Sequence, residues 1–275
     1  MIRRTPRIVI ALPAAVLASA LSARSGSAYP PDYGPFDPNH EPARFPLAEC
    51  PMVAEEGPAV VMGRQTMVYG DDRTGGPRLR ASAASFFEGV TIEVVDADGK
   101  AVAGPSYASD FPPHSRPDSA FCADLNHDGR LDFVLPLASR GNGLGMLFHE
   151  LVVALSSGSK YRIWIVPTAA PGPEDFLVLT DPGQCVIVKA SFASNESPAE
   201  SRRHSYWVYN LLAVRNDELI EANDLGSRFP KWIWYTARPN HKPAALSAAE
   251  KNRIWSLQRE PMVREASPHT PAKYD

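Results

Sequence analysis

The chain has 275 residues, of which 44% are hydrophobic and 21% are charged, and its formal net charge is -3. A weakly acidic chain without a basic cluster lacks the charge pattern of nucleic-acid-binding proteins, so we expect no nucleic-acid partner. The length suffices for one large domain or two small ones with a buried core.

The N-terminus has the pattern of a secretory signal peptide. Arginine residues near the start precede an apolar run over residues 8–21, and small residues follow. We expect removal of residues 1–28 by cleavage after Ala28, with cleavage after Ala23 as the second choice. The apolar run is short for a membrane anchor, and no later stretch approaches the roughly 20 apolar residues that cross a bilayer. The sequence therefore predicts a periplasmic or secreted mature chain without a membrane span.

A proline-rich segment follows over residues 29–46, which contain six prolines among polar residues. Because proline has no backbone N–H to donate, we expect this segment to be an extended arm outside any sheet. The domain itself is expected over residues 47–258, and residues 259–275 are expected to form a polar tail, which frays over its last stretch, residues 265–275.

Alternating apolar residues indicate strands over the middle of the chain. Val90, Ile92 and Val94 would share one face, and the turn-forming residues 96–99 then predict a hairpin. The uninterrupted apolar run 151–155 suits a strand covered on both faces. Further strands are expected over residues 120–125, 132–138, 147–155, 161–166, 176–180, 185–192, 206–214 and 218–221. Short strands separated by tight turns predict a mostly antiparallel all-β fold, either propeller-blade-like or a sandwich.

One helix is predicted near the C-terminus. Ser247 and Glu250 have the spacing of a capping box, in which the hydroxyl and the carboxylate each bind an amide at the helix start. Ile254, Trp255 and Leu257 would give this helix its apolar side.

Three cysteines lie in a chain expected to reach a compartment that permits disulfides. An odd number leaves one cysteine over. Cys122 and Cys185 both fall in predicted strands and are the preferred pair, while Cys50 would stay free. The alternative is that the cysteines are buried free thiols, since cysteine packs as a small hydrophobic residue.

The loop from Asp124 to Asp132 carries the strongest chemical signal in the chain. Asp124, Asn126 and Asp128 stand at alternate positions, Asp132 stands at the ninth, and the carbonyl of Arg130 can supply a further oxygen at the seventh. Calcium prefers six to eight such hard oxygen ligands. Three carboxylates within nine residues would repel one another without a cation, so we expect bound Ca²⁺. The alternative is an Asp- and Asn-rich turn that binds no ion.

The sequence around this loop does not fit an EF-hand. That motif has a glutamate at position twelve and flanking helices, whereas Leu135 stands there and both flanks are predicted strands. The residues 120–134 instead resemble the integrin-type FG-GAP repeat, found in bacteria as the VCBS repeat. The resemblance implies a β-propeller-like blade in which a structural calcium ion fixes the turn. It departs from that family in number, because this chain has one intact loop.

The aromatic residues Trp232 and Trp234 alternate with Ile233 and are candidates for stacking on a sugar ring or a peptide proline. Core packing is the alternative for both. The sequence favours a calcium-stabilised binding or scaffold module with a protein or glycan ligand over an enzyme, and it identifies no catalytic residue. The alternative function is a hydrolase of envelope polymers or polysaccharides in which the calcium loop is only structural.

Overall fold

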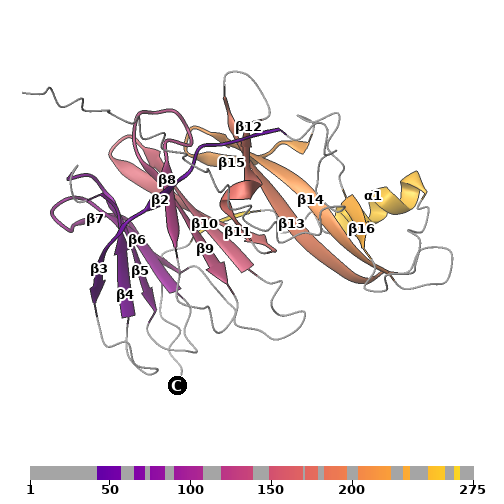
Figure 1. The fold of residues 1–275 in the computed structure, drawn as a ribbon, viewed down its shortest axis with the longest axis horizontal. Coiled ribbons are helices and arrows are strands. Elements are labelled where there is room, and N and C mark those ends of the chain that lie inside the picture. Colours follow the sequence, from indigo (N-terminus) through magenta and orange to yellow (C-terminus); the bar gives the residue numbers. More distant parts are fainter. Residues whose placement is uncertain are drawn as a thin grey trace, which may run out of the picture.

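In a computed structural model of the protein, the residues that the structure describes form three antiparallel β-sheets, one α-helix and a short 3-10 helix, Pro173–Asp175. Figure 1 shows the arrangement of these elements. The structure describes residues 42–56, 65–71, 75–83, 90–107, 119–138, 149–169, 171–178, 183–196, 204–223, 232–235, 247–257 and 263–266. The predicted signal peptide and most of the predicted arm lie outside these residues. Within them, the mostly antiparallel β fold with one helix is confirmed. No helix among them is both long and apolar enough to span a membrane.

The first sheet, here called the N-terminal sheet, is a meander in which each strand pairs with the next one along the chain. Its strands are β3 (Met52–Glu56), β4 (Gln65–Tyr69), β5 (Arg78–Ala83), β6 (Val90–Val95) and β7 (Ala101–Tyr107). The predicted hairpin is confirmed: the Gly99 N–H donates to the Asp96 carbonyl at 3.0 Å between β6 and β7.

The second sheet, the central sheet, has the order β17-β11-β10-β9-β8-β2. Its strands are β2 (Ala48–Cys50), β8 (Ala120–Ala123), β9 (Asp132–Ala138), β10 (His149–Ser157), β11 (Lys160–Thr168) and β17 (Arg264–Glu265). Two short segments from opposite ends of the chain, β2 and β17, therefore cover its two edges. Covered edges protect a sheet from pairing with other chains.

The third sheet, the C-terminal sheet, is built on the long hairpin of β13 and β14. Its strands are β1 (Ala43–Arg44), β12 (Phe176–Val178), β13 (Cys185–Glu196), β14 (His204–Arg215), β15 (Glu218–Glu221) and β16 (Trp232–Tyr235). Both β15 and β16 pair with β14, at successive stretches of that strand. The helix α1 (Ala248–Leu257) lies beyond β14 and buries Ile254 against Tyr206 and Val208.

The capping box at the start of α1 is confirmed. The Ser247 N–H donates to Glu250 Oε2 at 3.2 Å, and the Glu250 N–H donates to Ser247 Oγ at 3.3 Å. These two bonds satisfy amides that an isolated helix end leaves without partners.

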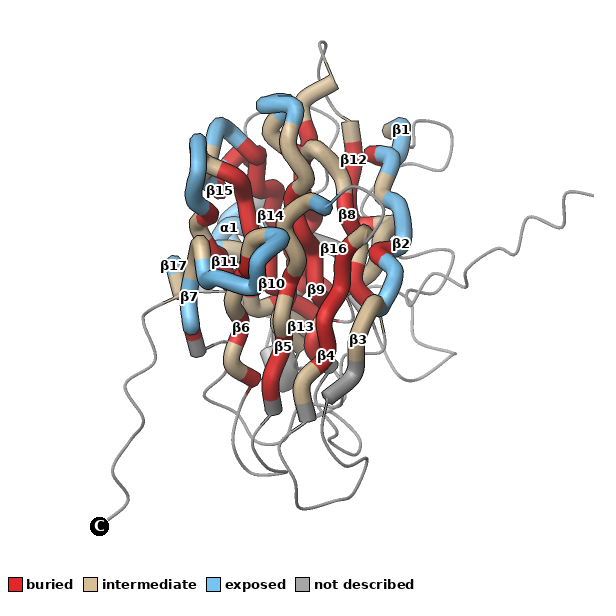
Figure 2. Tube along the Cα trace, turned by 90° about the vertical axis from the view of Figure 1, so that its left-hand side faces the viewer, coloured by how far each residue is buried: buried red, intermediate tan, exposed pale blue. Residues whose placement is uncertain are grey.

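The central sheet packs against a neighbouring sheet on each of its faces. Phe133 and Leu135 on β9 pack with the N-terminal sheet, whereas Val134 packs with the C-terminal sheet. The run 151–155 on β10 is fully buried in the same alternating way, as the sequence predicted. Figure 2 shows buried stretches along the strands of the stack, while the edge strands β1 and β2 carry exposed residues.

Two terminal segments correct the predicted boundaries. Ala43 and Arg44 pair with β12, so the end of the predicted arm joins a sheet. This is feasible because Pro42 and Pro46 flank the paired stretch without interrupting it. The predicted polar tail also pairs at 264–265, where β17 adds to β11.

The preferred disulfide is wrong, because Cys122 bonds to Cys50 and Cys185 is a buried free thiol. The Cα atoms of Cys50 and Cys122 are 5.4 Å apart, within the normal range for a disulfide. Cys50 and Cys122 lie in the core between the N-terminal and central sheets, while Cys185 lies in the core on the other side of the central sheet. The central sheet therefore separates the two cysteines that the sequence had paired.

A buried lysine gives the C-terminal sheet an expected dependence of stability on pH. Lys189 on β13 lies opposite Asn210, its side chain is nearly inaccessible, and its Nζ donates to Ser191 Oγ at 3.2 Å. Burial lowers the pKa of Lys189 from 10.5 to about 8, because the charged amine loses its hydration.

Wild-type stability is therefore expected to rise by about 1 to 2 kcal/mol between about pH 8 and pH 9.5, relative to the Lys189→Met variant. Between the folded and unfolded pKa values the unfolded chain binds more protons, so raising the pH favours the folded state. Below pH 8 the amine is charged in both states and its burial penalty is fully present. Urea denaturation at the two pH values measures the difference, with exposed Lys160→Met as the control. The prediction would be contradicted if the free energy of unfolding changed with pH in the same way in the wild type and in Lys189→Met.

Candidate metal centre

The loop between β8 and β9 wraps tightly around its own side chains. His127 and Gly129 adopt left-handed backbone conformations, with φ of 60° and 82°. Glycine tolerates this region without strain, which accounts for Gly129 at the sharpest part of the turn. The loop therefore turns sharply between β8 and β9.

Three of the predicted ligands are brought together around a few backbone amides. The Asp128 N–H lies 3.0 Å from Asp124 Oδ1 and 3.2 Å from Asn126 Oδ1, so both oxygens converge on one donor. Asp124 Oδ2 also accepts from the Gly129 N–H at 2.9 Å. Asp128 Oδ1 accepts from the Arg130 N–H at 2.9 Å.

The fourth predicted side-chain ligand, Asp132, is fully buried at the start of β9. Its Oδ2 accepts from the N–H groups of Leu125, at 2.7 Å, and Asn126, at 3.4 Å. Its Oδ1 accepts from the Ser156 N–H at 2.7 Å. Burial raises the pKa of Asp132 to about 6, although the hydrogen bonds that it accepts act in the opposite direction. Asp132 thus closes the loop and joins it to β10.

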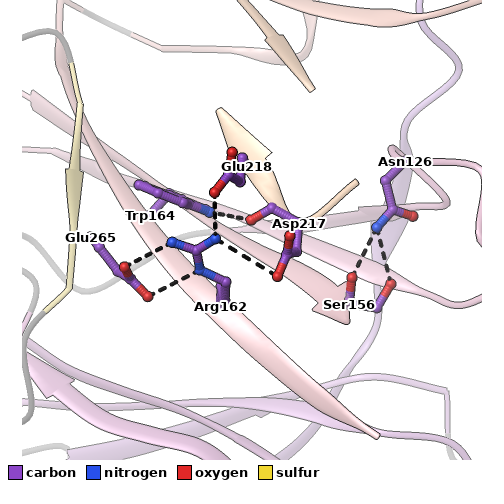
Figure 3. A network of polar contacts seen from close by, with 7 residues as sticks. All are labelled: Asn126, Ser156, Arg162, Trp164, Asp217, Glu218 and Glu265. Carbon is purple, nitrogen blue, oxygen red and sulfur yellow. Dashed lines mark hydrogen bonds and ion pairs between the residues drawn. The ribbon is translucent and has the colours of Figure 1, made fainter. Parts of the chain in front are cut away.

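Ser156 at the end of β10 is a residue of this centre that the sequence analysis missed. Its Oγ donates to Asp128 Oδ2 at 2.8 Å, and its carbonyl accepts from Asn126 Nδ2 at 2.9 Å. Figure 3 shows the Asn126 amide directed at Ser156. Only the pairing of β10 with β9 brings this serine to the loop, so no local sequence pattern could have identified it.

Further contacts connect the loop to the surrounding sheets. His127 Nε2 lies 3.1 Å from the carbonyl of Gly183, just before β13 in the C-terminal sheet. The Tyr161 hydroxyl donates to the Leu131 carbonyl at 2.8 Å, and the Arg130 guanidinium lies 5.3 Å from the centre of the Tyr161 ring. The loop is thereby held by the central sheet and contacts the turn that leads into the C-terminal sheet.

A second polar network in Figure 3 holds β17 in place. Arg162 Nε and Nη2 donate to the two carboxylate oxygens of Glu265 at 3.1 and 2.9 Å, and Nη1 donates to Glu218 at 3.0 Å. The guanidinium also lies 4.6 Å from the centre of the Trp164 ring, and Trp164 Nε1 donates to the Asp217 carbonyl at 2.7 Å. This network connects β11, β17 and the turn between β14 and β15, which is a structural role.

The side-chain oxygen atoms of the loop are of the kind that hard cations prefer as ligands. Asp124, Asn126, Asp128 and Asp132 offer oxygens, and an oxygen that accepts one hydrogen bond keeps a second lone pair. In the part of the chain that the structure describes, however, no three His, Cys, Asp or Glu side chains are grouped closely enough to hold a metal ion. The loop carboxylates are instead directed at N–H and O–H donors, which relieve their mutual repulsion.

The two candidate stacking residues lie on β16. Trp232 pairs with Val208 and Trp234 pairs with Tyr206 in the register with β14. The side chains of both tryptophans lie outside the described part of the structure, so a ligand-stacking role stays a prediction.

Comparisons with protein-family models, curated proteins and solved structures find no significant match to this chain.

Proposed function

We propose that this chain is an exported β module, stabilised by one calcium ion in the loop 124–132, with a binding or scaffold role outside the cytoplasm. The observation that carries the proposal is the position of this loop. It joins two strands of the central sheet, is anchored to β10 through Asp132 and Ser156, and contacts the turn before β13 through His127. The resemblance to the FG-GAP and VCBS repeats implies a structural ion that fixes the turn, and an ion at this position would also stabilise the contacts that the loop makes with β10.

The ion would supply positive charge to a loop with three carboxylates. Asp124, Asn126 and Asp128 would bind through lone pairs that their hydrogen bonds leave available, and Asp132 through Oδ1. The Arg130 carbonyl is the further ligand that the spacing predicts. An ion with this structural role would not take part in a reaction. The binding partner of the module would be a protein or a glycan. The alternative of a polysaccharide-acting hydrolase stays a hypothesis, since no contact among the described residues favours it.

Calcium is expected to raise the Tm of the wild-type protein by about 3 to 6 °C. At a tenfold excess of ion over Kd, binding stabilises the folded state by about 1.4 kcal/mol, and a domain of this size gains about 2 to 4 °C per kcal/mol. Asp128→Ala is expected to abolish most of this calcium-dependent rise, because a central ligand is lost. Thermal melts in excess chelator and in millimolar calcium measure both values.

Asp98→Ala is the matched control, because Asp98 is an exposed carboxylate in the Asp- and Gly-containing turn between β6 and β7. Calcium should raise the Tm of Asp98→Ala by as much as it raises the Tm of the wild type. Superimposable wild-type melts with and without calcium, together with no heat of binding in calorimetry, would show that the loop is only a turn.

A further inference from the structure

We propose that residues 43–56, here called the strap, form a redox-sensitive latch on the three sheets. The strap contains β1, β2 and β3, which are end strands of the C-terminal, central and N-terminal sheets respectively. Figures 1 and 2 show these strands following one another along one side of the stack. The Cys50–Cys122 disulfide locks the strap in place, and its reduction allows the strap to leave all three sheets as one unit. The latch would work with or without an ion in the loop 124–132.

The disulfide lies between the contacts that the strap makes with the two outer sheets. On one side of it, the Phe45 N–H donates to the Phe176 carbonyl of the C-terminal sheet at 2.8 Å. On the other side, the Gly70 N–H, just after β4, donates to the Pro51 carbonyl of the strap at 2.9 Å. Between these bonds, β2 pairs with β8, and Cys50 is covalently bonded to that strand. A crosslink in the middle of the strap therefore opposes release of the strap as a whole.

The sequence of the strap accounts for its path across three sheets. Pro46 and Pro51 each stand between two successive strands, so their missing N–H groups interrupt no ladder. Phe45 is buried in the core between the central and C-terminal sheets, and Cys50 is buried in the core between the central and N-terminal sheets. The strap thus contributes side chains to both cores.

The strap depends on the crosslink because its individual pairings are short. The strands β1, β2 and β3 have two, three and five residues. Pairings of this length are marginal by themselves. A dithiol reductant breaks the S–S bond, supplies two electrons and two protons to the cysteine sulfurs, and is itself oxidised to a disulfide. The strap is then held only by hydrogen bonds and buried side chains, so it opens more often and exposes the N–H and C=O groups of the sheet edges beneath it.

The redox state of the surroundings sets the position of the latch. Disulfides persist outside the cytoplasm and are kept reduced within it. In an exported protein, as proposed above, the strap is therefore locked, whereas the chain before export has the unlocked strap.

Amide hydrogen exchange under native conditions tests the latch. The amides of Phe45 and Gly70 report on the two ends of the strap, because each donates a hydrogen bond that joins the strap to a sheet. Reduction of the wild-type protein with dithiothreitol should accelerate the exchange of both amides by a similar factor, about 10- to 100-fold. The double variant Cys50→Ala/Cys122→Ala should show the same acceleration without reductant.

Two edge amides outside the strap serve as controls. The Ala222 N–H donates to the Leu211 carbonyl, and the Ala266 N–H donates to the Ile163 carbonyl. Their exchange rates should change by less than about threefold on reduction. Equal acceleration of all four amides would show only a global loss of stability, and acceleration at one end of the strap or at neither end would show that it does not open as one unit. Each of these results overturns the latch.

Phe45→Ala tests the coupling between the two ends of the strap. The substitution removes a buried anchor at the C-terminal sheet and leaves the disulfide in place. In the oxidised protein the crosslink should confine the effect, so that exchange of the Gly70 amide stays within about threefold of the wild type. After reduction, the same substitution should accelerate Gly70 exchange by a further factor of about ten or more, because the strap then opens as a whole. An equal effect of Phe45→Ala on Gly70 in the oxidised and the reduced protein would refute the latch.

Discussion

Replacing Asp132 by alanine is expected to lower the free energy of unfolding by about 3 to 6 kcal/mol, in chelator as well as in calcium. The side chain is fully buried and accepts the N–H groups of Leu125, Asn126 and Ser156. Without it, three backbone donors lose their acceptor, two of them buried and the Asn126 N–H partly buried, at about 1 to 2 kcal/mol each. A typical domain has only about 5 to 15 kcal/mol of stability in total. The expected loss is thus a large fraction of the stability of the fold.

Urea denaturation of the variant and the wild type in chelator measures this effect without any contribution from the ion. Asp132→Asn should be intermediate, because it keeps one acceptor oxygen and replaces the other by a donor that faces an N–H. Asp98→Ala, which removes an exposed carboxylate, should change stability by less than about 0.5 kcal/mol. A loss below about 1 kcal/mol for Asp132→Ala would show that the loop does not depend on this anchor.

Removing the Cys50–Cys122 disulfide with the double variant Cys50→Ala/Cys122→Ala is expected to destabilise the protein by about 4 kcal/mol. The bond closes a loop with a sequence separation of 72, which spans the whole N-terminal sheet. In the chain-entropy account, a crosslink over so long a loop strongly restricts the unfolded chain. Opening the crosslink makes the unfolded state more favourable and leaves the folded contacts largely intact.

Denaturation under non-reducing conditions measures the loss in the free energy of unfolding. Adding reductant to the wild-type protein should lower its free energy of unfolding to that of the double variant. Cys185→Ala is the control: it should cost about 1 kcal/mol through the small cavity it leaves, and it should respond to reductant as the wild type does. A peptide containing Cys122 linked to Cys185 in a non-reducing digest would contradict the assignment.

The strands that the sequence predicted correctly are those in which buried residues alternate with more exposed ones, or in which every residue is buried. The period-two pattern of Val90, Ile92 and Val94 and the apolar run 151–155 each report on the local environment of one strand, so neighbouring residues suffice to detect them. The start of the helix at Ser247 could also be predicted from neighbouring residues, because a capping box spans only four residues.

The strands that it missed carry weak local signals. In β5, Leu79 and Ala81 are completely buried, yet they alternate with Arg78 and Arg80, and alanine contributes little to an apolar pattern. The edge strands β1 and β17 are two residues long, and their pairing depends on β12 and β11 being already in place. Such short segments are ordered by tertiary contacts, which no window of sequence contains.

The sequence by itself determined the oxygen-rich loop, the strand character of its flanks and the turn-forming role of Gly129, because all three depend on residues within one short stretch. The tertiary structure alone decided that Ser156 completes the loop and that Cys50, in place of Cys185, bonds to Cys122. Both results follow from strand pairing and from the face of the central sheet on which each side chain lies. The central sheet places Cys122 and Cys185 in different cores, and its register brings Ser156 to a loop 24 to 30 residues away along the chain.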